Sequence, residues 1–198
     1  MIAKRIFDIV LSMLGLAFLS PLFAIIAIWI KLDSPGAVFF RQVRVGRHGN
    51  LFRIYKFRTM VANAEATGRQ ITVGDDQRIT KSGKFLRRYK LDEFPQLINV
   101  FLGDMSLVGP RPEVPRYVAL YPPATRERVL SVRPGITDFA SLEYKDENAV
   151  LGHAADPERV YIEEILPVKL HYYERYVSER SFCADIKLIW HTLKAIFN

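Results

Sequence analysis

Two adjacent carboxylates, Asp92 and Glu93, have the type and spacing that metal and phosphate chemistry uses. Pro95 follows closely, and proline is tolerated in the first turn of a helix. We therefore expect Asp92 to cap a helix that runs toward Phe101 and ends at Gly103. Unpaired N–H groups and the helix dipole stabilise carboxylates at a helix start, so a well-capped helix alone would explain the pair. The alternative is a site where both carboxylates hold Mg²⁺ beside a phosphate.

Cations near the pair in the sequence favour the phosphate site. Arg111 lies between two prolines and Arg133 precedes a Pro-Gly pair, so rigid turns present both side chains. A guanidinium group binds two phosphate oxygens at once. Further cations come from the flanking segments: Lys56, Arg58, Arg87 and Arg88.

The composition excludes several classes of protein. Hydrophobic residues make up 49% of the 198 residues, which excludes a disordered tail. A single cysteine, Cys183, excludes an intrachain disulfide framework and a cysteine-based zinc site. The net charge of +7 fits anionic lipid, nucleic acid or a phosphorylated substrate. Nucleic acid is the least favoured partner, because the basic residues are dispersed and form no nucleic-acid-binding motif.

An apolar segment near the N-terminus indicates a membrane anchor. Residues 9–30 carry no charge, and roughly twenty apolar residues suffice for a membrane-spanning helix. A cleavable signal peptide fits poorly because the run is too long and no small-residue cleavage site ends it. A buried core helix is disfavoured because the run is apolar on every side. Two interpretations remain open: a kinked spanning helix and a hairpin that enters the membrane and returns.

The dipeptide Ser20-Pro21 divides the apolar run. Proline removes a helical donor and bends the helix, and a preceding serine can satisfy the freed backbone group. Residues 7–19 would then span only ~20 Å, too short to cross alone. Cations flank both ends, including Lys4 and Arg5 before the run and Lys31 after it. Because positive residues prefer the cytoplasmic side, both ends favour that face, and the hairpin is slightly preferred.

The remaining elements have local signals. Residues 38–57 predict a β-hairpin around Gly46 to Asn50, and Thr80 predicts the cap of a short helix. A helix is expected to start near Pro157. Residues 181–197 carry an apolar stripe at helical spacing, which suits either an interfacial membrane helix or a helix packed on the core.

Seven sequence runs, in one order and spacing, carry a resemblance to a known family: KRIFD (residues 4–8), SP (20–21), FFRQ (39–42), YKFRTM (55–60), LDEFPQLINV (91–100), GDMSLVGPRP (103–112) and RPGIT (133–137). Over nearly its full length the chain resembles the bacterial sugar transferases, which are monotopic phosphoglycosyl transferases that act on polyprenyl phosphate. The resemblance implies an α+β fold: a small, helix-dominated cytoplasmic domain with a β-hairpin and amphipathic interfacial helices. It also implies a re-entrant membrane helix over residues 1–31, bent at Ser20-Pro21, and a catalytic domain over residues 32–198.

The resemblance further implies transfer of a sugar 1-phosphate from a UDP-sugar to undecaprenyl phosphate, with release of UMP. This would be the first membrane step of surface glycan assembly, on the cytoplasmic face of the bacterial inner membrane. Asp92 would be the nucleophile that forms a covalent phospho-sugar intermediate, with Glu93 assisting through metal or proton handling. Asp92 and Glu93 would hold Mg²⁺. The expected phosphate-binding residues are Arg111, Arg133, Lys56 and Arg58.

Two segments depart from the pattern of many family members. After residues 134–137 many members continue with glycine and a later Gln-Val-x-Gly-Arg run. This chain instead has Asp138, Phe139, Ala140, Ser141, Leu142 and Glu143. Many members also carry an aspartate where this chain has Tyr173. Both changes lie outside the Asp-Glu pair, so they leave the reaction class intact and the sugar unassigned.

Two other functions are weighed against sugar-phosphate transfer. One is a non-catalytic basic scaffold bound to anionic membrane lipid. The other is a membrane-bound phosphohydrolase that uses the same carboxylates with water as acceptor. The sequence leaves open whether the protein forms a homodimer.

Overall fold

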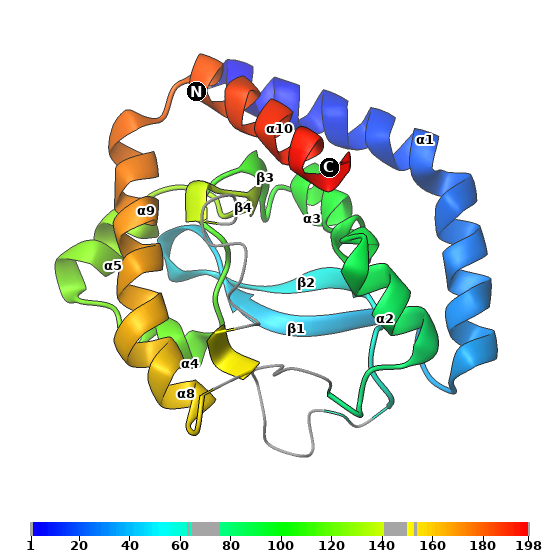
Figure 1. Cartoon of the computed structure of the whole chain (residues 1–198). Coiled ribbons are helices and arrows are strands. Elements are labelled where there is room, and N and C mark those ends of the chain that lie inside the picture. The colour runs from blue at the N-terminus through cyan, green and yellow to red at the C-terminus, as the bar shows by residue number, and fades with distance from the viewer. Residues whose placement is uncertain (1, 63, 65–75, 141–149, 153, 198) are drawn as a thin grey trace.

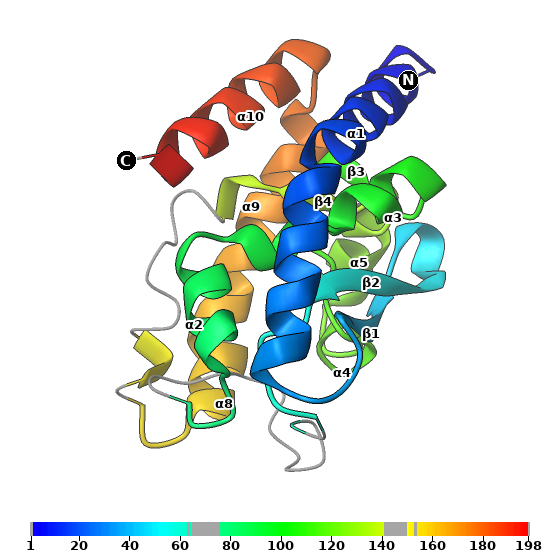
Figure 2. The ribbon, with the colours of Figure 1, turned by 90° about the vertical axis from the view of Figure 1, so that its right-hand side faces the viewer.

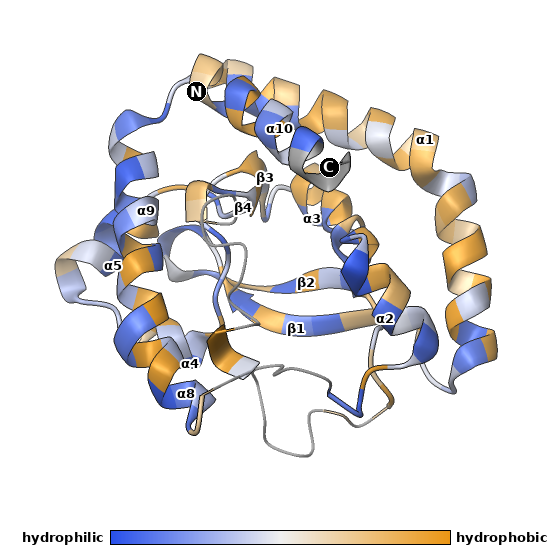
Figure 3. Ribbon diagram, viewed as in Figure 1, coloured by the Kyte–Doolittle hydropathy of each residue, from blue (hydrophilic) through white to orange (hydrophobic). Residues whose placement is uncertain are grey.

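The N-terminal helix α1 (Ile2–Asp33) is a long apolar element along one side of the molecule (Figures 1 and 3). The structure is a computed structural model that describes residues 2–62, 64, 76–140, 150–152 and 154–197. Among these residues, α1 alone is long and apolar enough to cross a membrane, and only 11% of its most apolar window is buried. Because a core helix would be mostly buried, this exposure counts against the core-helix interpretation.

Helix α1 changes direction partway along its length (Figure 1). Pro21 lies inside the helix and has no N–H to donate to the carbonyl of Ala17. The hydroxyl of Ser20 donates to that carbonyl instead, at 2.8 Å. The serine therefore satisfies the backbone group that the proline frees, as the sequence predicts.

In the part of the chain that the structure describes, two small sheets accompany the helices. Strands β1 (Phe39–Val45) and β2 (Leu51–Phe57) form an antiparallel hairpin, which confirms the predicted one. A 3₁₀ turn (Arg47–Gly49) joins them. The second sheet is a parallel pair, β3 (Ser106–Val108) and β4 (Gly135–Thr137).

Further helices make up most of the remaining described chain (Figures 1 and 2). They are α2 (Lys81–Arg88), α3 (Gln96–Leu102), α4 (Pro115–Val118), α5 (Pro123–Val129), α8 (Pro157–Val160), a π-helical turn (Tyr161–Ile165), α9 (Leu166–Glu179) and α10 (Phe182–Phe197). Thr80 caps α2 by accepting a hydrogen bond from the N–H of Gly83 at 3.0 Å, as predicted. The helix expected near Pro157 is also present. The fold is therefore the expected helix-dominated α+β type.

The C-terminal half of α1 packs against the domain. Ile26 and Ile30 are buried in one apolar cluster with Phe57 of β2 and Leu86 of α2. Burying side chains of this size stabilises the docked helix by about 1.5–3 kcal/mol each. Helix α1 is therefore part of the frame that supports β2 and α2.

Helix α10 has one buried and one exposed face. Leu188 is buried with Tyr176 of α9, whereas Ile186 is exposed and Trp190 is 68% exposed. The predicted contact with the core is thus confirmed for one face. Contact of the other face with a membrane stays a prediction.

Candidate active site

Asp92 and Glu93 lie in a 3₁₀ turn (Leu91–Glu93) that precedes α3. The prediction that Asp92 caps the helix is wrong. A cap at Asp92 would accept hydrogen bonds from the backbone N–H groups of residues 94 and 95. The N–H of Phe94 instead donates to the carbonyl of Leu91 at 3.3 Å, and Pro95 has no N–H. The predicted helix end at Gly103 is confirmed, with φ +99° at that glycine. The Asp92 carboxylate is consequently left without a capping role.

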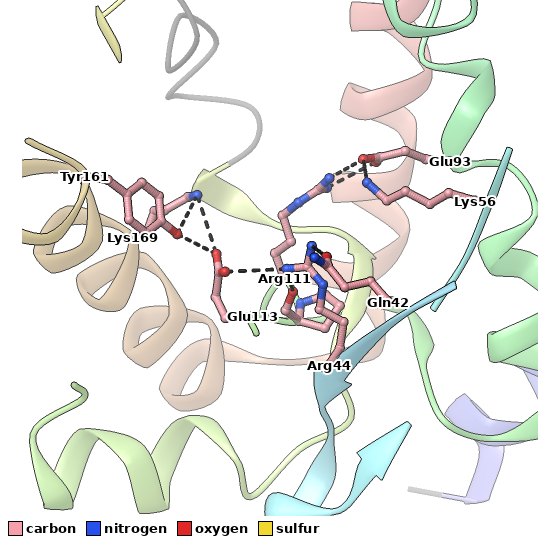
Figure 4. Close-up of polar contacts among 9 residues, drawn as sticks. Gln42, Arg44, Lys56, Glu93, Arg111, Glu113, Tyr161 and Lys169 are labelled. Atoms are coloured by element: carbon pink, nitrogen blue, oxygen red, sulfur yellow. Dashed lines mark hydrogen bonds and ion pairs between the residues drawn. The ribbon is translucent and has the colours of Figure 1, made fainter. Parts of the chain in front are cut away.

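Glu93 is held by two cations from other elements (Figure 4). Lys56 of β2 donates from Nζ to Oε1 at 2.7 Å. Arg111 donates from Nη1 to Oε2 at 3.1 Å and from Nη2 to Oε1. Burial would raise the pKa of Glu93, but Arg111 and Lys56 together hold that pKa well below its usual range. Glu93 is therefore an ionised carboxylate whose charge is balanced inside the protein.

Asp92 has different surroundings from its neighbour. It is 8% exposed, and no described residue forms a hydrogen bond or ion pair with its carboxylate. Burial raises the pKa of Asp92, Lys56 opposes that rise and the charge of Glu93 adds to it. Two adjacent carboxylates thus have pKa values displaced in opposite directions, a pattern typical of groups with separate chemical roles.

Arg87 of α2 is a further cation near Asp92. Its Nε donates to the hydroxyl of Thr59 at 2.9 Å. Burial lowers the pKa of Arg87 and the charge of Asp92 opposes that change. The sequence identified Arg87 as one of the flanking cations without giving it a role, and in the structure its charge acts on the Asp92 carboxylate.

Arg58 is engaged elsewhere. Its guanidinium is buried and donates to the carbonyls of Ile30 at 3.2 Å, Ser34 at 2.7 Å and Pro35. Those carbonyls lie at the C-terminal end of α1, where unpaired acceptors and the helix dipole favour a cation. The contact gives Arg58 a structural function, and its predicted phosphate contact remains untested.

Arg133 lies at the other end of α3 from Asp92. Its Nε donates to the carbonyl of Gly103 at 2.8 Å. Arg5 binds the carbonyls of Val100 and Phe101 close by. Helix α3 has seven residues, so about 10 Å separates its two ends. Of the four predicted phosphate-binding residues, the structure brings Lys56 and Arg111 to the Asp-Glu pair.

Two glycines let the chain present Arg111. The turn that carries Arg111 follows β3 and crosses closely over the turn before β4, with the N–H of Gly135 donating to the carbonyl of Pro110 at 2.9 Å. A Cβ atom on Gly109 would lie 2.5 Å from the carbonyl oxygen of Arg133. Only glycine permits that approach, so these residues fix the backbone that leads to Arg111.

A second polar network surrounds Glu113 (Figure 4). Arg44 of β1 donates to the carbonyl of Pro112 at 3.0 Å and pairs with Glu113 at 3.6 Å. Glu113 also accepts from the hydroxyl of Tyr161 at 2.6 Å and pairs with Lys169 at 3.7 Å. Sequence analysis missed this network, because its members are far apart in the chain and no local pattern links them.

The described residues contain no group of three or more histidine, cysteine or acidic side chains that could hold a metal ion. Mg²⁺ does not require such a group, because it commonly binds one or two carboxylates together with substrate phosphates. The carboxylate of Asp92, which no described side chain engages, suits that role. Both oxygens of Glu93 are already bound by Lys56 and Arg111, so Glu93 is less suited as a ligand in this arrangement.

The two sequence departures lie partly in the described structure. Asp138 and Tyr173 are both buried, and Asp138 acts electrostatically on Arg111. Burial raises the pKa of Tyr173, and Asp138 adds to the rise. The Tyr173 hydroxyl has no hydrogen-bond partner in the part of the chain that the structure describes. Residues 141–143 lie outside the described residues.

Comparison with known proteins adds independent evidence. A sequence profile described as "Bacterial sugar transferase" matches residues 1–198. The chain is 38% identical over 196 residues to a UDP-N-acetylgalactosamine-undecaprenyl-phosphate N-acetylgalactosaminephosphotransferase of Aeromonas hydrophila, covering 98% of this chain and 43% of that protein. It is 38% identical over 194 residues to the UDP-glucose:undecaprenyl-phosphate glucose-1-phosphate transferase of Escherichia coli (strain K12), covering 96% and 39%.

A third relative has a length closer to that of this chain. The chain is 36% identical over 198 residues to the uncharacterized sugar transferase EpsL of Bacillus subtilis (strain 168), covering 99% of this chain and 88% of that protein. The chain thus spans about two fifths of the two relatives with assigned substrates and most of the third.

Proposed function

The chain belongs to the bacterial sugar transferase family, and on that premise we propose that it transfers a sugar 1-phosphate from a UDP-sugar to undecaprenyl phosphate. The observation that carries the proposal is the asymmetry of the carboxylate pair. Asp92 is unpaired among the described residues, whereas Glu93 is neutralised by Lys56 and Arg111. A free carboxylate beside clustered cations is suited to attack an anionic phosphorus centre.

The reaction proceeds in two displacements at one phosphorus atom. An oxygen of Asp92 bonds to the phosphorus that carries the sugar, and the bond from that phosphorus to the UMP oxygen breaks. A phosphate oxygen of the lipid acceptor then attacks the same phosphorus, and the bond to Asp92 breaks. The second step regenerates the carboxylate and leaves a lipid-linked sugar diphosphate.

The cations beside Asp92 make this attack feasible. Lys56 favours the ionised form of Asp92, which is the nucleophilic form. Glu93 holds Lys56 and Arg111 in fixed positions, and each cation retains N–H groups that can bind phosphate oxygens. Arg87 adds positive charge from α2. Mg²⁺ held by Asp92 and the donor diphosphate would supply further neutralisation of the phosphate charge.

The membrane arrangement in this proposal is a re-entrant anchor over residues 1–31 and a catalytic domain over residues 32–198 on the cytoplasmic face. The exposed apolar surface of α1, its bend and the Ser20 contact to Ala17 support it. The exposed Trp190 of α10 supports contact of that helix with the interface. A nucleophile supported by α1 would then work at the depth of the acceptor phosphate.

The decisive experiment supplies purified protein with Mg²⁺, undecaprenyl phosphate and a panel of UDP-sugars, and measures UMP and lipid-linked product. Without acceptor, mass spectrometry of the digested protein should detect a phospho-sugar adduct on a peptide that contains Asp92. Asp92→Asn should reduce turnover by about a thousandfold or more. Glu127→Gln, which alters an exposed carboxylate on α5, is the matched control and should retain full activity.

The same assay separates the two alternative functions. A phosphohydrolase would release free sugar phosphate and form no lipid-linked product. A non-catalytic scaffold would show no Mg²⁺-dependent turnover and would bind anionic liposomes equally well after Asp92 and Glu93 are replaced. Absence of the adduct and of lipid-linked product with every donor would contradict the proposed function.

A further inference from the structure

The polar residues at the start of α1 are hydrogen bonded inside the protein. Arg5 donates to the carbonyls of Val100 at 2.7 Å and Phe101 at 3.0 Å, at the C-terminal end of α3. Asp8 is buried and accepts from the hydroxyl of Ser106 at 2.8 Å and from the N–H of Leu107 at 3.1 Å. The beginning of the apolar helix is thus fixed to α3 and to strand β3.

Lys4 completes a closed set of contacts at the end of β3. Its Nζ donates to the carbonyl of Val108 at 3.3 Å and to the carboxylate of Asp185 on α10. The Tyr176 hydroxyl of α9 lies 3.0 Å from the same carbonyl and 3.0 Å from the other oxygen of Asp185. Four groups from α1, β3, α9 and α10 therefore form one ring, which we call the Lys4 ring: Lys4, Asp185, Tyr176 and the Val108 carbonyl.

The Lys4 ring is largely desolvated. Asp185 and Tyr176 are buried, and Lys4 is 21% exposed at its side chain. Burial and then the charge of Asp185 raise the pKa of Tyr176, so its hydroxyl keeps its proton and donates. Removing one member would leave a buried polar partner unsatisfied, which is costly. The ring therefore restrains the Val108 carbonyl strongly.

The chain between Val108 and Arg111 has little freedom. The next residue, Gly109, donates to the carbonyl of Thr137 at 3.1 Å, and the carbonyl of Pro110 accepts from Gly135 at 2.9 Å. Proline fixes its own φ and restricts the residue before it. A displacement of the Val108 carbonyl is consequently transmitted to Arg111.

We propose that Lys4, Asp185 and Tyr176 are positioning residues for Arg111, linking the start of the apolar helix to the cation that would bind donor phosphate. The part of this inference that concerns donor binding rests on the proposed function. Lys4 is then more than a positive charge that orients a membrane segment. It sets where β3 ends, and thereby where the Arg111 guanidinium meets Glu93.

The test compares Lys4→Met with the conservative variant Lys4→Arg in the full chain. Hydrogen exchange of the peptide that covers residues 106–111 reports how firmly β3 and the turn after it are held. We expect about tenfold faster exchange of the Leu107 and Gly109 amides in Lys4→Met and near wild-type exchange in Lys4→Arg. Steady-state kinetics with the UDP-sugar should show a rise of about tenfold in KM for Lys4→Met, because phosphate contact weakens while the nucleophile is unchanged.

Tyr176→Phe is a second variant for the case that Lys4→Met fails to fold. It removes one hydroxyl from the Lys4 ring and preserves the packing of the aromatic ring. Glu179→Gln breaks an exposed ion pair to Arg175 on the same helix and is the matched control, expected to change neither readout. In an Arg111→Lys background, Tyr176→Phe should raise KM less than it does in the wild-type background, because both changes act through one contact.

The outcomes separate this inference from the proposed function. A lower melting temperature with unchanged exchange at residues 106–111 and unchanged KM would show a merely structural ring and overturn the inference. Additive effects with Arg111→Lys would also overturn it. If the variants show the expected exchange pattern but the wild-type protein forms no lipid-linked product, the proposed function is contradicted. The inference that the Lys4 ring holds β3 in position would still stand.

Discussion

Arg111 donates from both terminal guanidinium nitrogens to the carboxylate of Glu93, and the two residues come from turns on separate elements. Lys56 donates to the same carboxylate from β2. Both cations therefore bind Glu93 and not Asp92. The two adjacent carboxylates therefore have different electrostatic surroundings, which is consistent with the different roles expected for them.

Glu93→Gln tests that difference. The substitution removes the negative charge that Lys56 and Arg111 both bind, so the pKa of Lys56, which burial already lowers against the opposing charge of Glu93, should fall further. We expect the free energy of unfolding to fall by about 1–3 kcal/mol. This is less than the cost of breaking a fully buried ion pair, because these side chains retain solvent contact. We also expect a fall of about a hundredfold in kcat. Thermal melting and the UMP-release assay measure the two effects.

The control for this variant is Glu163→Gln, which breaks an exposed pair with Arg159 on the surface. Exposed ion pairs contribute little to stability, so the melting temperature and the rate of UMP release should match those of the wild-type protein. Unchanged turnover in Glu93→Gln would show that the cations do not depend on Glu93 for their positions.

We expect Asp33, at the C-terminal end of α1, to make a pH-dependent contribution to the stability of the fold. Its Oδ2 accepts from the N–H and the hydroxyl of Ser82, each at 2.8 Å, in the first turn of α2. The backbone hydrogen bond from Ser82 is the main cause that lowers the pKa of Asp33 from its usual value of 3.8. A lowered pKa in the folded state means that the ionised form stabilises the fold above about pH 4, and that this stability is lost as the pH falls further.

Asp33→Asn should therefore lower the melting temperature at pH 7 by an amount that corresponds to about 0.5–1 kcal/mol. The difference from the wild-type protein should shrink as the pH is lowered through 4 toward the folded-state pKa. Melting curves at a series of pH values measure it. A constant difference across that range would show that charge is not the cause.

Local patterns were sufficient to predict much of the fold. The Thr80 cap, the hairpin between β1 and β2 and the helix end at Gly103 each depend on residues close together in the chain. The incorrect cap at Asp92 also had a local cause, since Pro95 cannot supply the N–H that such a cap needs. Secondary structure was thus predictable where backbone chemistry decides it.

The partners of charged side chains were harder to predict. The neighbouring prolines indicated that rigid turns hold Arg111 and Arg133. They did not indicate that Arg111 binds Glu93 or that Arg133 binds the carbonyl of Gly103. The sequence also did not indicate that Arg58 binds carbonyls at the end of α1, and its expected phosphate contact stays a prediction. The partners of Arg58 depend on how α1 packs against the domain, and each of the three contacts joins residues that are distant in the sequence.

Gly109→Ala should disrupt the turn that presents Arg111. The added Cβ would meet the carbonyl oxygen of Arg133 at 2.5 Å, a contact that the backbone can relieve only by moving. We expect a loss of about 2 kcal/mol or more in stability together with a rise in donor KM. Gly49→Asn is the control, because that position has φ +81°, open space around it and a conformation that asparagine tolerates. Wild-type melting and KM in Gly109→Ala would contradict the close approach.

The bend at Pro21 predicts the topology of the anchor. In Pro21→Leu the restored N–H can donate to the Ala17 carbonyl, and residues 9–30 would form a straight helix of about 33 Å, enough to span the bilayer core. We expect the N-terminus to stay cytoplasmic in the parent protein and to cross the membrane in a measurable fraction of the Pro21→Leu protein. Lys4 and Arg5 oppose that crossing, so the fraction should be incomplete.

Cysteine labelling measures this topology directly. Cys183 is the only cysteine, so a Cys183→Ser background allows Ile2→Cys to be labelled alone by a membrane-impermeant maleimide added outside intact spheroplasts. Ser131→Cys, in the catalytic domain, is the control and should stay unlabelled with either residue at position 21. Labelling of Ile2→Cys in the Pro21-containing protein would contradict the hairpin. Equal protection with and without Pro21 would show that the contacts of Lys4, Arg5 and Asp8, and not the proline, retain the N-terminus on the cytoplasmic side.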